Sequence, residues 1–190
     1  MSTIVVVKKN GKACIAADSL TTFGDLRMGA TYDTGHDKIQ RYGEGYFGIV
    51  GSAAHALVME SVMKHDKVKM EFSDRMSIFE TFRKLHPILK DKYFLIAKDE
   101  DEDPYEATHI DAVICNPNGI FGVYSLREVS EYNSFWAIGS GSEFALGAMH
   151  ALYHRLDSAE DIARAGVEAG AEFNTATSLP LTLHTVDLKD

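Results

Sequence analysis

The chain opens with two apolar runs separated by a tight turn, the pattern of a β-hairpin. "TIVVVKK" (residues 3–9) and "ACIAADS" (residues 13–19) flank Asn10-Gly11, a dipeptide that favours the two-residue hairpin turn. The glycine-punctuated stretch that follows contains two more short strand candidates, at 38–42 and 46–50. We therefore expect two successive hairpins at the start of the fold.

From Ser52 the hydrophobic period changes to that of a helix. Apolar residues recur mostly three and four positions apart, at Ala53, Ala56, Leu57, Met59, Val62 and Met63. Ser52 is the expected N-cap of this helix. A second helix is predicted over "SDRMSIFETFRKLHPILKDKY" (73–93), with Ser73 as its cap and Pro87 either kinking it or ending a turn.

The remainder of the chain repeats the order of strands followed by helices. "IDAVICNPNGIFGVYS" (110–125) predicts another hairpin and "SFWAIGSG" (134–141) a further strand. Helical patterns then cover 142–156 and 158–173, and "LTLHTVDL" (181–188) predicts a final strand. Such segregated blocks favour an α+β fold, a four-layer αββα sandwich in which two antiparallel sheets lie between helix layers.

Composition narrows the class of protein further. The 190 residues, 45% hydrophobic and 25% charged, are typical of one globular domain spanning 1–190. The net charge of -9 argues against nucleic acid as a partner. Cys14 and Cys115 lie in apolar strands, as buried thiols do in a reducing cytoplasm. No signal peptide or membrane span is expected, and "KDEDEDPYEATH" (98–109) is interpreted as a solvated loop.

The first residues carry the candidate chemistry, because a hydroxyl residue stands directly behind Met1 and ahead of a core strand. N-terminal-nucleophile hydrolases use such a residue twice, its hydroxyl as the nucleophile and its α-amino group as the base. The amine titrates near neutral pH, so a modest lowering of its pKa suffices. This chemistry needs a nearby buried cation and a carboxylate to orient it, but no metal or cofactor.

"STIVVVKKNGKACIAADS" resembles the start of the proteasome β-subunit family, in particular its bacterial HslV ring peptidases. The resemblance implies that Ser2, freed by removal of Met1, is the nucleophile. Spacing to the aspartate that ends the hairpin favours Ser2 over Thr3. Further matches imply the remaining catalytic roles, which fall on Asp18, on Lys38 in "GHDKIQRY", on Gly51 in "GIVGSAAHA" for the oxyanion, and on Ser140 in "AIGSGSEFA" as the supporting hydroxyl.

The same resemblance implies a substrate site and an assembly. Thr22 pairs with an extended peptide through its backbone, and Ile49 and Ala53 line an apolar P1 pocket beside Gly51. Stacked rings are expected to enclose the sites, with unfolded polypeptides or peptides as substrates and an ATP-dependent unfoldase as a possible partner. The family's Asp-x-x-Ser pair after the last long helix has Glu172 and Thr175 as its nearest equivalents.

Each candidate also has a purely structural interpretation. On that interpretation Ser2 is an ordinary terminal residue, Asp18 an Asx-turn residue, Lys38 a surface lysine, and Gly51 and 139–141 turn residues. At the level of function, two alternatives to a peptidase remain. One is a catalytically silent ring protein of the same fold, and the other is an N-terminal-nucleophile amidohydrolase that acts on a small amide.

Overall fold

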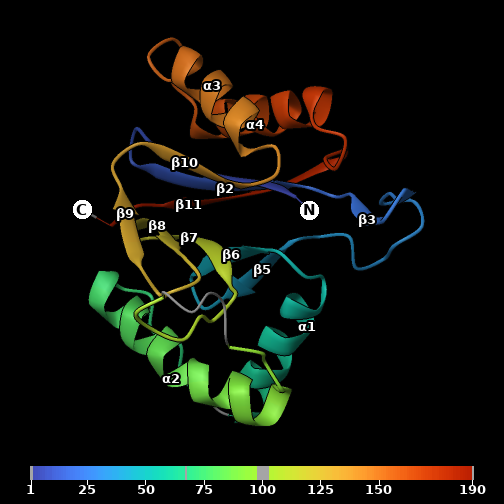
Figure 1. Ribbon diagram of the computed structural model, residues 1–190. Helices are drawn as coiled ribbons and strands as arrows, with labels where there is room; N and C mark the ends of the chain where they lie inside the picture. Colours follow the sequence, from blue (N-terminus) through green and yellow to red (C-terminus); the bar gives the residue numbers. More distant parts are fainter. Residues whose placement is uncertain (1, 67, 98–102, 190) are drawn as a thin grey trace.

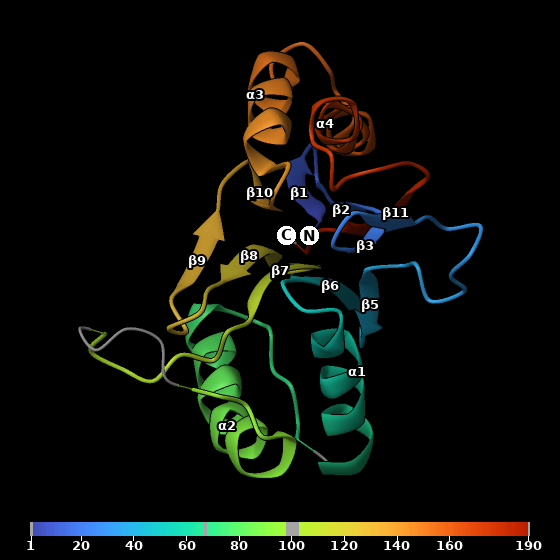
Figure 2. The same ribbon diagram turned by 45° about the vertical axis from the view of Figure 1, so that its right-hand side comes forward.

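The computed structural model describes residues 2–66, 68–97 and 103–189, which form the predicted four layers. Helices α3 and α4 cover one sheet and helices α1 and α2 cover the other, with the two sheets face to face between them (Figure 1). The same stacking is visible after a turn of the molecule (Figure 2). The predicted αββα sandwich is therefore confirmed.

The first sheet has four antiparallel strands in the order β10-β1-β2-β11. They are β1 (Thr3–Lys9), β2 (Lys12–Asp18), β10 (Phe135–Gly139) and β11 (Leu181–Asp187). The predicted opening hairpin is thus the centre of this sheet, with Asn10 and Gly11 in its turn, both at positive φ. The last strand of the chain pairs with β2 rather than with a neighbour in sequence.

The second sheet has five antiparallel strands in sequence order, β5 to β9. They are β5 (Ile39–Tyr42), β6 (Gly45–Val50), β7 (Asp111–Asn116), β8 (Gly119–Val123) and β9 (Val129–Tyr132). A small separate ribbon is formed by β3 (Thr21–Phe23) and β4 (Leu26–Met28). The predicted hairpins over 38–50 and 110–125 are present, whereas β3, β4 and β9 were not predicted.

The helices are α1 (Ala54–Ser61), α2 (Arg75–Tyr93), α3 (Ser142–Leu152) and α4 (Ala159–Phe173). A short π-helical turn, η1 (Val62–Asp66), continues α1. Two predicted caps are wrong by one residue. The N-cap of α1 is Ala53, although the Ser52 hydroxyl accepts a bond from the Ala54 amide. Asp74 rather than Ser73 caps α2, because its carboxylate accepts from the Ser77 amide, and Pro87 lies within that helix.

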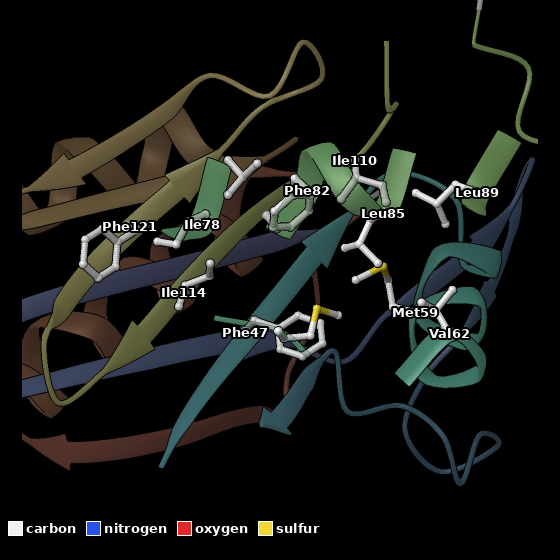
Figure 3. Close-up of a cluster of buried hydrophobic side chains, with 13 residues drawn as sticks. Phe47, Met59, Val62, Ile78, Phe82, Leu85, Leu89, Ile110, Ile114 and Phe121 are labelled. Carbon is white, nitrogen blue, oxygen red and sulfur yellow. The ribbon is translucent and has the colours of Figure 1, made fainter. Parts of the chain in front are cut away.

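Three apolar clusters hold the layers together. The first lies between α1, α2 and the five-stranded sheet, and it includes the large side chains of Phe47, Phe82 and Phe121 (Figure 3). The second lies between α3, α4 and the four-stranded sheet, and the third lies between the two sheets. The predicted surface loop over 98–109 is only partly described, since 98–102 lie outside the described residues. Ala107 and Thr108 in it are buried, which corrects that prediction.

Strand β1 is apolar without interruption because both of its faces are buried. Successive side chains of a strand point to opposite faces, so Val5 and Val7 pack toward α3 and α4, while Ile4 and Val6 pack between the sheets. This parity continues to the start of the strand. A side chain at position 3 must face the helix layer, and one at position 2 must face the space between the sheets.

Candidate active site

Ser2 lies at the open end of the interface between the sheets, on the wall of a cavity of about 1200 Å³. The cavity runs from β3 past the segment before β5 to α1. Six of the eight residues predicted for the site line it, namely Ser2, Thr22, Lys38, Ile49, Gly51 and Ala53. The other two do not line the cavity but contact residues that do, Asp18 through Lys38 and Ser140 through the Ser2 carbonyl.

Thr3 faces the opposite way, as the alternation along β1 requires. It is fully buried, and its hydroxyl forms a hydrogen bond of 2.7 Å with the Thr177 hydroxyl. A Cβ at Gly141 or Gly170 would collide with its side chain, so these two glycines make the space that Thr3 fills. The Thr3 hydroxyl is therefore part of the wall between β1 and the helix layer, away from the cavity.

Asp18 ends β2 as a fully buried carboxylate with four hydrogen-bond donors around it. Its Oδ1 accepts from the Lys38 ammonium at 2.8 Å and from the Thr3 amide at 2.9 Å. Its Oδ2 accepts from the amides of Leu20 at 3.0 Å and Ser178 at 3.3 Å. The Asx-turn interpretation is confirmed for Oδ2, which accepts from Leu20, while Oδ1 binds the lysine.

Lys38 is placed just before β5 and points back to the end of β2. Its ammonium donates to Asp18 and also to the Leu20 carbonyl at 2.7 Å, and only 13% of the side chain is exposed. Burial lowers the pKa of the Lys38 ammonium, and the Asp18 carboxylate partly offsets that effect. Lys38 is thus a buried cation on the cavity wall, not the surface lysine of the alternative interpretation.

Gly51 follows β6 at a φ of +114°, a left-handed conformation that a side chain would strain. A Cβ there would also meet the ring of His55 at 3.3 Å. Burial lowers the pKa of His55, so the ring packed against Gly51 is biased toward its neutral form. The backbone at Gly51 borders the cavity beside Ala53.

Ser140 links the start of the chain to the end of α4. Its hydroxyl is 3.4 Å from the Ser2 carbonyl oxygen and 3.1 Å from Asn174 Oδ1, to both of which it can donate. The Asn174 amide donates in turn to the Ser140 carbonyl at 2.9 Å. The hydroxyl therefore supports the backbone of Ser2 rather than lining the cavity itself.

The two residues after the last long helix that contact Ser140 and Thr3 differ from the nearest equivalents found in the sequence. Glu172 and Thr175 are exposed, whereas Asn174 and Thr177, also three residues apart, contact Ser140 and Thr3. The signal that could have found them is the end of α4 at Phe173, since a pair that reaches back to the site has to follow the helix rather than lie in it.

No helix in the described part of the chain is long and apolar enough to span a membrane. Within the same residues, no group of three or more histidine, cysteine, aspartate or glutamate side chains could hold a metal ion. A hydroxyl residue, a buried lysine and an aspartate at the open end of an αββα sandwich are the features of an N-terminal-nucleophile hydrolase.

Comparison with known proteins narrows this class. No protein-family model matches the chain. It is 38% identical to Thiobacillus denitrificans BPH, solved in complex with epoxomicin, with a TM-score of 0.92 over 99% of this chain and 100% of that one. It is 28% identical to the ATP-dependent protease subunit HslV of Petrotoga mobilis, over 98% of this chain and 97% of that protein. Eukaryotic HslV from Trypanosoma brucei shares the fold, with a TM-score of 0.67 at 20% identity over 97% of this chain and 99% of that one.

The chain belongs to the proteasome β-subunit-like N-terminal-nucleophile hydrolases, close to HslV. The predicted family is thereby confirmed, and with it the enzyme class, a hydrolase of the N-terminal-nucleophile peptidase type.

Proposed function

We propose that this protein is a self-compartmentalising peptidase whose nucleophile is Ser2, exposed by removal of Met1. The observation that carries the proposal is the alternation of side chains along β1, which directs the Ser2 side chain into the cavity with Lys38 and the Thr3 side chain into the wall behind it. Met1 itself lies outside the described residues, so its removal is part of the proposal.

In the proposed reaction the free amine of Ser2 takes the proton from its own Oγ, directly or through a water, and Oγ attacks a peptide carbonyl. The charged Lys38, oriented by Asp18, lowers the pKa of that amine and stabilises the developing negative charge. The Gly51 amide binds the oxyanion, and Ser140 supports the Ser2 backbone. The protonated amine returns its proton to the peptide nitrogen as the C–N bond breaks and that product leaves, and a water then hydrolyses the acyl-enzyme with the amine again acting as the base.

The cavity favours a peptide over a small amide. Thr22 is on the short strand β3 at its edge, where an extended chain can pair with the backbone. Ile49 and Ala53 form an apolar surface beside Gly51, which suits an apolar P1 side chain. A volume of about 1200 Å³ exceeds what a single small amide fills.

Membership of the same family supports the proposed assembly. HslV relatives are named as subunits of an ATP-dependent protease. We infer that this chain forms stacked rings that enclose the cavities, receives unfolded polypeptide from an ATP-dependent unfoldase, and works in the cytoplasm. A catalytically silent ring protein of the same fold would keep the assembly but would lack turnover.

The test pairs two hydroxyl deletions that are one residue apart. Ser2→Ala is expected to abolish peptide turnover without loss of assembly, whereas Thr3→Val, which removes only the bond to Thr177, retains turnover. The intact mass of the wild-type chain establishes whether Met1 is absent. The proposal fails if Met1 is retained in active protein, or if Thr3→Val abolishes turnover while Ser2→Ala does not.

A peptide epoxyketone provides a second readout that does not depend on choosing a substrate. Its ketone and epoxide carbons can react with a hydroxyl and an amine on the same residue, so a ring adduct requires the free N-terminus as well as Oγ. We expect one adduct per chain on Ser2 in the wild type and none in Ser2→Ala. An unmodified wild type with Met1 removed would support the silent ring protein instead.

A further inference from the structure

The residue before Lys38 ties the lysine to a distant strand. Asp37 Oδ1 accepts from the Ile39 amide at 2.9 Å, which fixes the turn into β5. The same oxygen accepts from the Thr182 hydroxyl on β11, also at 2.9 Å. The other oxygen, Oδ2, lies 3.7 Å from Nε2 of His184. Three contacts therefore converge on one carboxylate next to the buried lysine.

The partners of Asp37 are themselves held in place by the sandwich. Thr182 and His184 are two residues apart on β11, so both project from the same face of that strand. The His184 ring stacks on Tyr46 of β6, with centroids 4.4 Å apart and planes at 10°. Through Asp37, the segment before β5 is thus connected to both sheets, one by the Thr182 bond and the other by the His184–Tyr46 stack.

Lys38 needs such a connection because the chain that leads to it has no regular structure. Residues 29–38, all of which the structure describes, form no helix or strand between the end of β4 at Met28 and the start of β5 at Ile39. A backbone of this kind is the most mobile part of a fold unless side chains hold it. The Lys38 ammonium has to remain between Asp18 and the reacting centre, and a displacement of about 1 Å at such a centre can cost on the order of a hundredfold in rate.

We propose that Asp37, clamped by Thr182 and His184, is a positioning residue that sets the location of the Lys38 ammonium. The inference rests on the proposed function, in which that ammonium lowers the pKa of the Ser2 amine. Asp37 acts through the backbone turn into β5 and takes no proton from the substrate. Without the clamp the ammonium moves away from the Ser2 amine, whose pKa then rises toward its ordinary value.

The decisive variant is Thr182→Val, which removes one clamp bond while leaving shape and charge unchanged. We expect kcat to fall about tenfold with KM nearly constant, since the lost geometry affects the transition state and not peptide binding. The acid limb of the kcat/KM profile should move to higher pH. Thr185→Val is the matched control, because Thr185 is on the same strand but faces Cys14 and Glu160.

Two substitutions of Asp37 distinguish the effect of its hydrogen bonds from the effect of its charge. Asp37→Asn keeps an oxygen that can accept from Ile39 and Thr182, so most of kcat should remain. Asp37→Ala removes both bonds and should match or exceed the loss in Thr182→Val. The clamp is refuted if Asp37→Ala and Thr182→Val keep the wild-type kcat and pH profile while Ser2→Ala is inactive, or if Thr185→Val is impaired equally.

A measurement on Lys38 keeps the inference testable even if the chain has no peptidase activity. Acetylation of amines at about pH 8, mapped by mass spectrometry, should be slow at Lys38 of the wild type, because its nitrogen is held by Asp18 and the Leu20 carbonyl and is shielded from the reagent. It should be several-fold faster in Thr182→Val and Asp37→Ala and unchanged in Thr185→Val. Equal rates at Lys38 in all four proteins would refute the clamp, whereas an inactive wild type with faster labelling in the two clamp variants would refute only the proposed function.

Discussion

Asp18→Asn is expected to destabilise the fold strongly although it barely changes the shape of the side chain. All four partners of the carboxylate are donors, three amides and the Lys38 ammonium. An asparagine offers one oxygen in place of two and directs its own N–H groups at the remaining donors. The substitution also removes the negative charge beside Lys38, whose side chain is only 13% exposed.

The size of the effect follows from that burial. Removing one partner of a buried ion pair costs about 3–5 kcal/mol, because the remaining charge is left without compensation. An unsatisfied buried amide costs about 1–3 kcal/mol, but this overlaps with the first figure and is not added to it. We therefore expect the free energy of unfolding to fall by about 3–5 kcal/mol at pH 7.

The pH dependence provides the sharper test. Burial already lowers the pKa of Lys38, and in Asp18→Asn no carboxylate would oppose that effect. Between the lowered folded pKa and the unfolded value, the unfolded chain binds more protons, so stability rises with pH at up to about 1.4 kcal/mol per unit. The penalty is therefore expected to shrink as the pH rises from neutral toward about 10, where Lys38 of the unfolded chain also loses its proton.

Urea unfolding at a fixed protein concentration, at about pH 7 and pH 9.5, measures both quantities. The wild type, Asp18→Asn and the double variant Asp18→Asn/Lys38→Met are compared, and the double variant should recover part of the loss because the buried charge at position 38 is gone. The reasoning is wrong if Asp18→Asn loses less than about 1 kcal/mol at pH 7, if its penalty is equal at both pH values, or if the double variant recovers nothing.

Two further predictions concern other parts of the site. Gly139→Ala should lower the free energy of unfolding by about 3 kcal/mol or more and abolish turnover, because φ is +94° and the new Cβ would overlap the Ser2 carbonyl oxygen. In the control Gly147→Ala the new Cβ has open space around it on α3, so thermal unfolding should show a neutral or stabilising effect. Burial raises the pKa of Cys14 to about 12, so a thiol reagent at neutral pH should neither modify the native chain nor slow peptide turnover, and fast modification with loss of activity would contradict this.

The sequence was most informative where local pattern and burial agree. The opening hairpin was predicted because a turn that needs positive φ separates two apolar runs, and the structure places those runs in the centre of a sheet with both faces covered. The four helices α1 to α4 were predicted because apolar residues recur three and four positions apart in their sequences. The short strands β3, β4 and β9 have little pattern of their own, since pairing with a neighbour decides whether three or four residues become a strand.

The site was predictable only in part, because several of its contacts join distant positions. Asn174 and Thr177 escaped detection because the contact between Thr3 and Thr177 spans 174 positions and depends on where α4 ends. Asp37 escaped because nothing local distinguishes it from other loop aspartates. Its importance arises from Thr182 on β11, which follows it in the chain by 145 positions.

Close packing, and not hydrophobicity, decides which of the two hydroxyls, that of Ser2 or that of Thr3, faces the cavity. Both faces of β1 are apolar, so a shift of one residue would still bury aliphatic side chains at about the same gain. It would, however, move Ile4 into the space that Gly141 and Gly170 leave for Thr3, and remove it from Gly48, where a Cβ would meet Ile4 at 3.0 Å. Glycines on both sides of the strand thus fix its register, and with it the hydroxyl that faces the cavity.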